Sequence, residues 1–132
     1  MPERGEIVNR NRAKQLRNFN GLRFGNITPT DIDGMIEYKN KCYVIMETKY
    51  ADTPILYGQE LALVRMCDDL HNAGKPTIGI ISSHQISNPE EDIDMAETIV
   101  ERFRYENKWH GGEGATTKDL VIRFLSWMER IK

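Results

Sequence analysis

Three acidic residues and a lysine lie at the ends of two neighbouring apolar segments, where charges are costly to place. Asp31 and Asp33 open the segment 31–38, and Glu47 and Lys49 close the next one. The composition of both segments predicts β-strands. Side chains on a strand alternate between its two faces, so the two aspartates share one face, and Glu47 and Lys49 share one as well.

The register of the hairpin between these strands decides whether the two sets of side chains meet. A two-residue loop at 39–40 would pair Tyr38 with Lys41 and would send the aspartates to the face opposite the glutamate. A three-residue loop at 39–41 would instead pair Tyr38 with Cys42. Because the asparagine in this loop tolerates a left-handed conformation, we expect the three-residue loop.

In the three-residue register, Asp33 lies opposite Glu47 and Asp31 lies opposite Lys49. Such pairs have Cβ atoms about 5 Å apart, and two carboxylates at that distance repel each other. Mg²⁺ would remove the repulsion, since it binds one or two carboxylates together with water and phosphate oxygens. The pattern therefore predicts a site for Mg²⁺, with Mn²⁺ as the alternative. A metal at this site would support phosphoryl chemistry. Lys49 would orient the attacking water or bind the scissile phosphate.

The Glu-x-Lys tripeptide alone carries little information. It occurs at 37–39, 47–49 and 106–108, whereas about one occurrence is expected by chance in a chain of this length. The first runs into the predicted hairpin turn, and the third ends a predicted surface helix. Only the second lies on a strand of core character.

Apolar periodicity in the rest of the chain predicts an α/β fold, in which a mixed sheet has helices on both faces. The 132 residues predict a single domain over 1–132. Strand 76–83 follows a helical crossover and can therefore join the sheet in parallel. We expect helices over 6–19, 55–73, 88–105 and 117–131, the last opened by a capping box of Thr116 and Asp119, and further strands over 22–27 and 76–83.

The composition is that of an ordinary globular protein, with 39% hydrophobic and 29% charged residues. No segment has the length and hydrophobicity of a membrane span, and the N-terminal residues do not resemble a signal peptide. We therefore expect a cytoplasmic protein without membrane contact. Cys42 and Cys67 lack metal-ligand spacing and are predicted to be buried free thiols.

Charge is distributed unevenly along the chain. The net charge is −2, but residues 1–23 carry +4 and the remainder carries −6. The basic segment is either a solvated helix face or an arm that contacts phosphates. On the second interpretation the DNA-contacting residues would be Arg4, Arg10, Arg12, Lys14 and Arg17.

The aspartate at the start of one strand and the Glu-x-Lys at the end of the next resemble the PD-(D/E)XK nuclease superfamily. Over roughly residues 6–84, the expected element order also resembles its restriction-endonuclease-like αβββαβ core, with two additional C-terminal helices beyond it. The resemblance implies that Asp33, Glu47 and the Thr48 carbonyl bind the metal, and that Lys49 is the catalytic lysine.

Further roles follow from the same resemblance. It implies that Gln59, on the helix after Glu-x-Lys, approaches the site, and that Glu6, on the first helix, assists it. The literal Pro-Asp pair is absent, because Pro29 precedes Thr30 and then Asp31. Either Asp31 or Asp33 can therefore be the motif aspartate, and Asp31 is a further candidate metal ligand.

The expected function is metal-dependent hydrolysis of DNA phosphodiester bonds, by endonucleolytic or exonucleolytic cleavage. A homodimer would add a second cutting site and more binding surface. Restriction-like, junction-resolving, repair and phage-type roles all remain open. The alternative is a non-catalytic nucleic-acid-binding or protein-binding module on the same fold. In that case the acidic residues would form surface ion pairs with Lys49, which contribute only about 0–1 kcal/mol.

Overall fold

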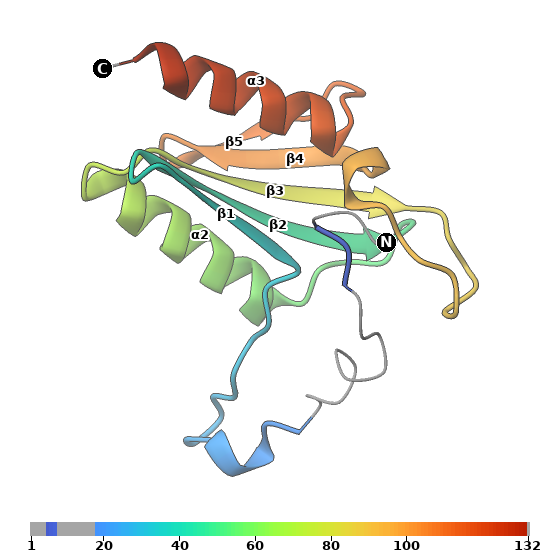
Figure 1. Cartoon of the computed structure of the whole chain (residues 1–132). Coiled ribbons are helices and arrows are strands. Elements are labelled where there is room, and N and C mark those ends of the chain that lie inside the picture. Colours follow the sequence, from blue (N-terminus) through green and yellow to red (C-terminus); the bar gives the residue numbers. More distant parts are fainter. Residues whose placement is uncertain (1–4, 8–17, 132) are drawn as a thin grey trace. The chain divides into compact units, whose positions relative to one another are not determined.

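The computed structural model describes residues 5–7 and 18–131, and the chain divides into two compact units between Thr30 and Asp31. The second unit contains a five-stranded sheet and two α-helices (Figure 1). The single-domain organisation expected from the chain length stays a prediction.

The first unit has little regular structure in its described residues. A 3₁₀-helix, η1 (Asn20–Leu22), precedes a tight turn in which Phe24 and Ile27 form an isolated β-bridge. The strand expected over 22–27 is therefore wrong, because the chain turns at Gly25, which has a φ of +61°, and does not extend. Most of the helix expected over 6–19 lies outside the described residues.

The second unit is built on a mixed sheet of strand order β1-β2-β3-β4-β5. β2 and β3 run parallel, and the other neighbours are antiparallel. The strand predicted after a helical crossover thus joins the sheet in parallel. The elements are β1 (Gly34–Tyr38), β2 (Cys42–Tyr50), α2 (Tyr57–Asn72), β3 (Thr77–His84), the 3₁₀-helix η2 (Met95–Glu97), β4 (Ile99–Tyr105), β5 (Lys108–Gly111) and α3 (Thr117–Arg130).

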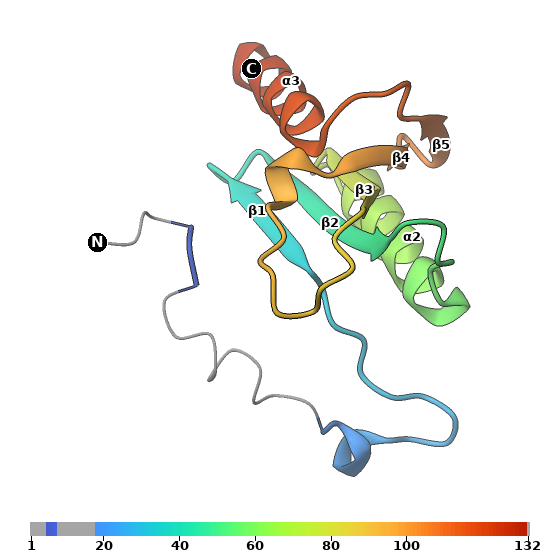
Figure 2. The ribbon, with the colours of Figure 1, turned by 90° about the vertical axis from the view of Figure 1, so that its right-hand side faces the viewer.

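The two α-helices cover opposite faces of the sheet, as the sequence predicts (Figures 1 and 2). The face under α2 has a small apolar cluster, formed by Ile45, Leu63, Cys67 and Ile81. The face under α3 has the larger core, formed by Cys42, Val44, Met46, Ile78, Ile80, Val100, Leu120, Phe124 and Met128. Both cysteines are free and buried, as predicted.

Local signals in the sequence set one end of each helix, the C-terminal end of α2 and the N-terminal end of α3. α2 ends where Gly74 adopts a φ of +100°, and the Lys75 N–H donates to the Leu70 carbonyl at 3.0 Å. α3 begins with the predicted capping box, in which Thr116 and Asp119 each accept a hydrogen bond from the other's backbone N–H. These helix boundaries confirm the predictions to within two residues.

The helix expected over 88–105 is wrong, so one α-helix, not two, follows β3. Asn88 and Pro89 open a turn, in which the Asn88 side chain and carbonyl accept the Glu90 and Glu91 N–H groups. The branched and aromatic residues that follow form β4, which pairs with β5 across a two-residue turn at 106–107. The third Glu-x-Lys therefore lies in a hairpin, where the end of a surface helix was expected.

In the described part of the chain, no helix is long and apolar enough to cross a membrane.

Close packing of α2 on β3 generates a stability prediction at Gly79. A Cβ atom at Gly79 would lie 2.5 Å from the Cys67 Sγ and 3.4 Å from Leu63 side-chain atoms. Gly79→Ala should therefore lower the free energy of unfolding by about 1–3 kcal/mol, measured by urea denaturation. Adding Cys67→Ala should recover part of that loss, because the two changes share one contact.

Gly111→Ala is the matched control, since a Cβ atom there meets no atom within 4 Å. Equal losses at the two glycines, or strict additivity of Gly79→Ala and Cys67→Ala, would contradict the close contact.

Candidate active site

The β1–β2 hairpin has the three-residue register on which the predicted site depends. Tyr38 pairs with Cys42, which leaves 39–41 as the loop, and the Lys41 N–H donates to the Tyr38 carbonyl at 2.8 Å. Asn40 has a φ of +60°, the left-handed conformation expected of it. This register extends to Gly34, at the start of β1, which pairs with Met46 in β2.

Asp33 precedes β1 directly and is held beside Glu47 by one hydrogen bond with Glu47 and one with Thr48. The Asp33 backbone N–H donates to Glu47 Oε1 at 3.3 Å, and the Thr48 N–H donates to Asp33 Oδ2 at 2.9 Å. β1 begins one residue later, so Thr48 has no strand partner on this side, and the Asp33 carboxylate takes that place. The local backbone thus brings Asp33 and Glu47 together.

The direction of the β2 backbone also places the Thr48 carbonyl at this site. The Tyr43 and Ala51 N–H groups donate toward β3, to Pro76 and His84 respectively. Successive residues of a strand alternate in direction, and the N–H and C=O of one residue point to the same side. The Thr48 carbonyl therefore faces the β1 side, where its N–H meets Asp33.

Glu47 is a buried acid with an unusual affinity for its proton. Only 6% of the residue is exposed, although it lies near the end of a strand. Burial is the first cause that raises the pKa of Glu47, to about 8, followed by the negative charge of Asp33, a hydrogen bond with Asp33 and the charge of Asp31. A buried carboxyl group whose pKa is raised by a second carboxyl group beside it is a recurrent feature of functional sites.

α2 brings Gln59 to the same patch. The Gln59 Nε2 donates to Asp31 Oδ1 at 3.3 Å, so the residues of the predicted site on β2, on α2 and before β1 lie together. The contact is with Asp31, which is exposed, and not with Asp33 or Glu47. Gln59 can orient Asp31, whose negative charge in turn acts on Glu47.

Lys49 is held by a partner that the sequence reasoning missed. Its Nζ lies 2.9 Å from Glu101 Oε2 and donates to the Ala51 carbonyl at 3.1 Å. The Lys49 side chain is only 13% exposed. Within the described residues, its ion pair is thus with β4 and not with the acidic pair beside it. Glu101 was placed on a helix, although the branched and aromatic residues around it favour a strand.

Two further ion pairs lie between α2 and β4 on this face. Arg102 pairs with Glu60, the neighbour of Gln59, and its guanidinium lies 4.2 Å from the centroid of the Trp109 ring. Arg104 makes a bidentate ion pair with Asp68, in which two guanidinium nitrogens donate to the two carboxylate oxygens at 2.7 and 3.0 Å. Such paired, partly buried guanidinium contacts fix orientation well, so they help to set where α2 presents Gln59.

The remaining predicted residues lie in the first unit or outside the described residues. Glu6 lies in a bend, where a helix was expected, and belongs to the unit 1–30. The predicted DNA-contacting residues all lie outside the described residues: Arg4, Arg10, Arg12, Lys14 and Arg17.

The donor atoms at the site match a small, hard cation. Among residues 5–7 and 18–131, no group of three or more His, Cys, Asp or Glu side chains could hold a metal ion together. Asp33, Glu47 and the Thr48 carbonyl nevertheless offer a set of oxygen ligands. Mg²⁺ commonly binds through only one or two carboxylates and completes its shell with water and substrate oxygens. The residues present therefore fit Mg²⁺ or Mn²⁺.

No family model, curated protein or solved structure matches this chain. The α/β fold with a five-stranded mixed sheet and helices on both faces is established by the structure itself. The resemblance to the PD-(D/E)XK superfamily stays a prediction.

The shifted pKa of Glu47 predicts how stability depends on pH without divalent cations. The ordinary value is 4.5 and the folded value is about 8, so the folded state holds the proton more tightly. The free energy of unfolding should therefore fall as pH rises through this interval, by at most a few kcal/mol. Urea denaturation in EDTA, between about pH 5 and pH 8, measures the decline.

Glu47→Gln should remove most of this decline, because glutamine does not titrate. Glu97→Gln, on the exposed surface of η2, is the matched control and should retain it. Parallel curves for the wild type and Glu47→Gln would show that Glu47 has no raised pKa.

Proposed function

We propose that this protein is a metal-dependent nuclease that hydrolyses phosphodiester bonds in DNA. The observation that supports it best is the pairing of Asp33 with buried Glu47 at the end of β2, two residues before a lysine on the same face. Repulsion between the two acids disfavours their joint ionisation. A cation is the natural compensation for that cost.

In the proposed site, the Asp33 and Glu47 carboxylates and the Thr48 carbonyl would hold the metal. When bound, Mg²⁺ lowers the pKa of water and neutralises negative charge at the phosphoryl group. Because Glu47 carries a proton at neutral pH, it must release that proton to become a ligand. Metal affinity should consequently be greater at higher pH.

Lys49 is the residue that would position the attacking water or the scissile phosphate. An ammonium group has three N–H donors, and two of those on Lys49 contact Glu101 and Ala51. One donor is therefore left for substrate, and the two anchors limit where it can point. A preorganised donor of this kind costs little reorganisation during the reaction.

DNA is the substrate class that the charge distribution favours. The basic residues at 1–23 could supply non-specific phosphate contacts, while the acidic pair supplies the chemistry. A homodimer would place two such sites on one duplex. The non-catalytic binding module is the rival proposal, and the cleavage assay separates the two.

The assay incubates the protein with linear, supercoiled, single-stranded and branched DNA in Mg²⁺ or Mn²⁺. We expect cleavage of at least one substrate, with a loss of at least about 100-fold in Asp33→Asn, Glu47→Gln and Lys49→Ala. Lys108→Ala, at the exposed start of β5, is the control and should cleave at the wild-type rate.

Cleavage that survives all three site substitutions would contradict the proposed mechanism. If the folded wild type cleaves no substrate, the chain is not a nuclease, and the non-catalytic module replaces that proposal.

Glu101 is proposed as a positioning residue that acts through Lys49. Glu101→Ala should lower kcat roughly 10- to 100-fold, because the ammonium loses one of its anchors. KM and Mg²⁺ affinity should hardly change, and Glu101→Gln, which keeps an acceptor oxygen, should recover part of the rate. Single-turnover cleavage and calorimetric Mg²⁺ titration measure these effects.

Glu97→Ala is the matched control for Glu101→Ala. Loss of Mg²⁺ affinity in Glu101→Ala, or equal rates for the alanine and glutamine variants, would contradict positioning through Lys49.

A further inference from the structure

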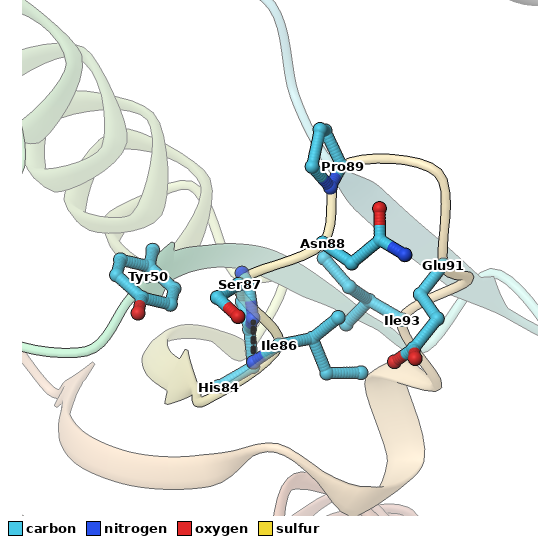
Figure 3. Close-up of a pocket in the computed structure, with 8 residues that line it drawn as sticks. All are labelled: Tyr50, His84, Ile86, Ser87, Asn88, Pro89, Glu91 and Ile93. Atoms are coloured by element: carbon cyan, nitrogen blue, oxygen red, sulfur yellow. Dashed lines mark hydrogen bonds between the residues drawn. The ribbon is translucent and has the colours of Figure 1, made fainter.

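A pocket opens at the carboxyl ends of β2 and β3, where Tyr50 and His84 point to the face of the sheet opposite Glu47 and Lys49. Its volume is about 360 Å³, and Figure 3 shows the side chains that surround it. Tyr50 and His84, the last residues of the two strands, pair in register on one side, and the loop after β3 forms the other. Ligands of α/β proteins commonly bind beyond the carboxyl ends of strands, and this volume is that of a small-molecule site.

Two buried hydroxyl groups lie on the same face of the sheet, two residues before the strand ends, and neither lines the pocket. Thr48 and Ser82 are register partners, two residues before Tyr50 and His84 on the same face. Three buried side-chain N or O atoms in the described residues lack a hydrogen-bond partner, and two of them are these hydroxyls. Leaving a buried hydroxyl unpaired costs about 1–3 kcal/mol, so these two groups mark a polar position in the sheet near the strand ends, where a water molecule would satisfy them.

The charges around the pocket disfavour an anionic group inside it. None of its eight lining residues is lysine or arginine, and Glu91 contributes a carboxylate. A phosphate inside the pocket would be repelled, so the phosphates of a bound nucleotide must stay outside it, whereas an amino group inside it would be attracted. Ile86 and Ile93 add apolar surface, and Tyr50 and Ile93 are 45% and 42% exposed at the opening.

The lining residues offer flat surfaces and hydrogen-bonding groups of both kinds. The rings of Tyr50 and His84 lie 5.7 Å apart at 60°. The Ile86 N–H donates to His84 Nδ1 at 3.1 Å, which leaves Nε2 as the donor. The Asn88 Oδ1 accepts the Glu90 N–H, so its amide NH₂ is the group available to a ligand. A carboxylate acceptor and two N–H donors match the edge of a base that has an amino group.

The pocket and the proposed catalytic residues share one stretch of chain. Lys49 and Tyr50 are consecutive, and Ala51 accepts a hydrogen bond from Lys49 and donates one to the His84 carbonyl. The side chains of Lys49 and Tyr50 point to opposite faces of the sheet, because successive residues of a strand alternate. A DNA strand that occupies both sites must therefore pass around the end of β2, and the base in the pocket would belong to a neighbouring nucleotide, not to the one whose phosphodiester is cleaved.

We propose that the pocket between Tyr50, His84, Glu91 and Ile93 binds an unpaired adenine, cytosine or guanine of the DNA strand that is cleaved. Stacking on the aromatic rings supplies most of the affinity, and Glu91 accepts a hydrogen bond from the amino group. The base must leave its duplex to enter, so the substrate is DNA with an unpaired nucleotide. This inference rests on the proposed nuclease function for its place in the reaction, but its test requires no cleavage.

The experiment measures binding in EDTA by fluorescence anisotropy. The probes are duplexes with one bulged dA, dC, dG or dT, or an abasic residue at the same position. Wild-type protein should bind the dA, dC and dG probes roughly 10-fold more tightly than the abasic probe. Tyr50→Ala should abolish this difference, and Tyr50→Phe should keep it.

Glu91→Gln should remove the preference for dA, dC and dG over dT, while its neighbour Glu90→Gln, which does not line the pocket, should keep it. Adenosine, added as competitor, should displace the bulged probe only weakly. If low micromolar concentrations of adenosine displace the probe, the pocket is a free-nucleoside site, and the assignment to DNA is wrong.

Equal binding of bulged and abasic probes by the wild type would overturn the pocket proposal, even if the protein cleaves DNA. Conversely, a Tyr50-dependent preference for a base would support the pocket even if the cleavage assay failed. The two proposals therefore fail by different results.

Discussion

Two hydrogen bonds join the residue before β1 to the end of β2, and the candidate site depends on them. Asp33 donates through its backbone to Glu47 and accepts through its carboxylate from the Thr48 N–H. The second bond satisfies a backbone group that β1, starting at Gly34, does not reach. The acidic residue thus has a structural role and a chemical one at once. A slip of one residue in the hairpin would remove both, because it would turn Asp33 to the other face.

The two faces of the sheet have different functions. The face under α3 carries most of the apolar core, while the face under α2 combines a small apolar cluster with ion pairs that reach β4. The ion pair between Lys49 and Glu101 also connects this face to β4. Ion pairs on the α2 face therefore fix the side chains around the site. The apolar core on the α3 face supplies most of the stability.

Local sequence signals explain which parts of the fold could be predicted. The hairpin at 39–41, the glycine stop of α2 and the capping box of α3 each depend on a few adjacent residues. The same reasoning failed at 88–105, because Asn88, Pro89 and the acids after them match the start of a helix as well as they match a turn.

The same limit applies to the candidate site. Asp33, Glu47 and Gln59 could be proposed because a hairpin and the following helix bring them together. Glu101 could not, since its contact with Lys49 exists only once β4 has paired with β3, and that pairing includes a register shift between Ile81 and Ser82. Long-range pairing of this kind leaves no trace in residue spacing.

The place of β1 in the strand order gives the site a dynamic property. β1 lies at the edge of the sheet and pairs with β2 alone, whereas β2 is an interior strand. Edge elements open locally at a lower free-energy cost than buried ones. Each such opening would carry Asp33 away from Glu47 and leave the core intact. A cation bridging the two carboxylates would oppose that motion, so amide exchange along 34–38 would report whether the site is occupied.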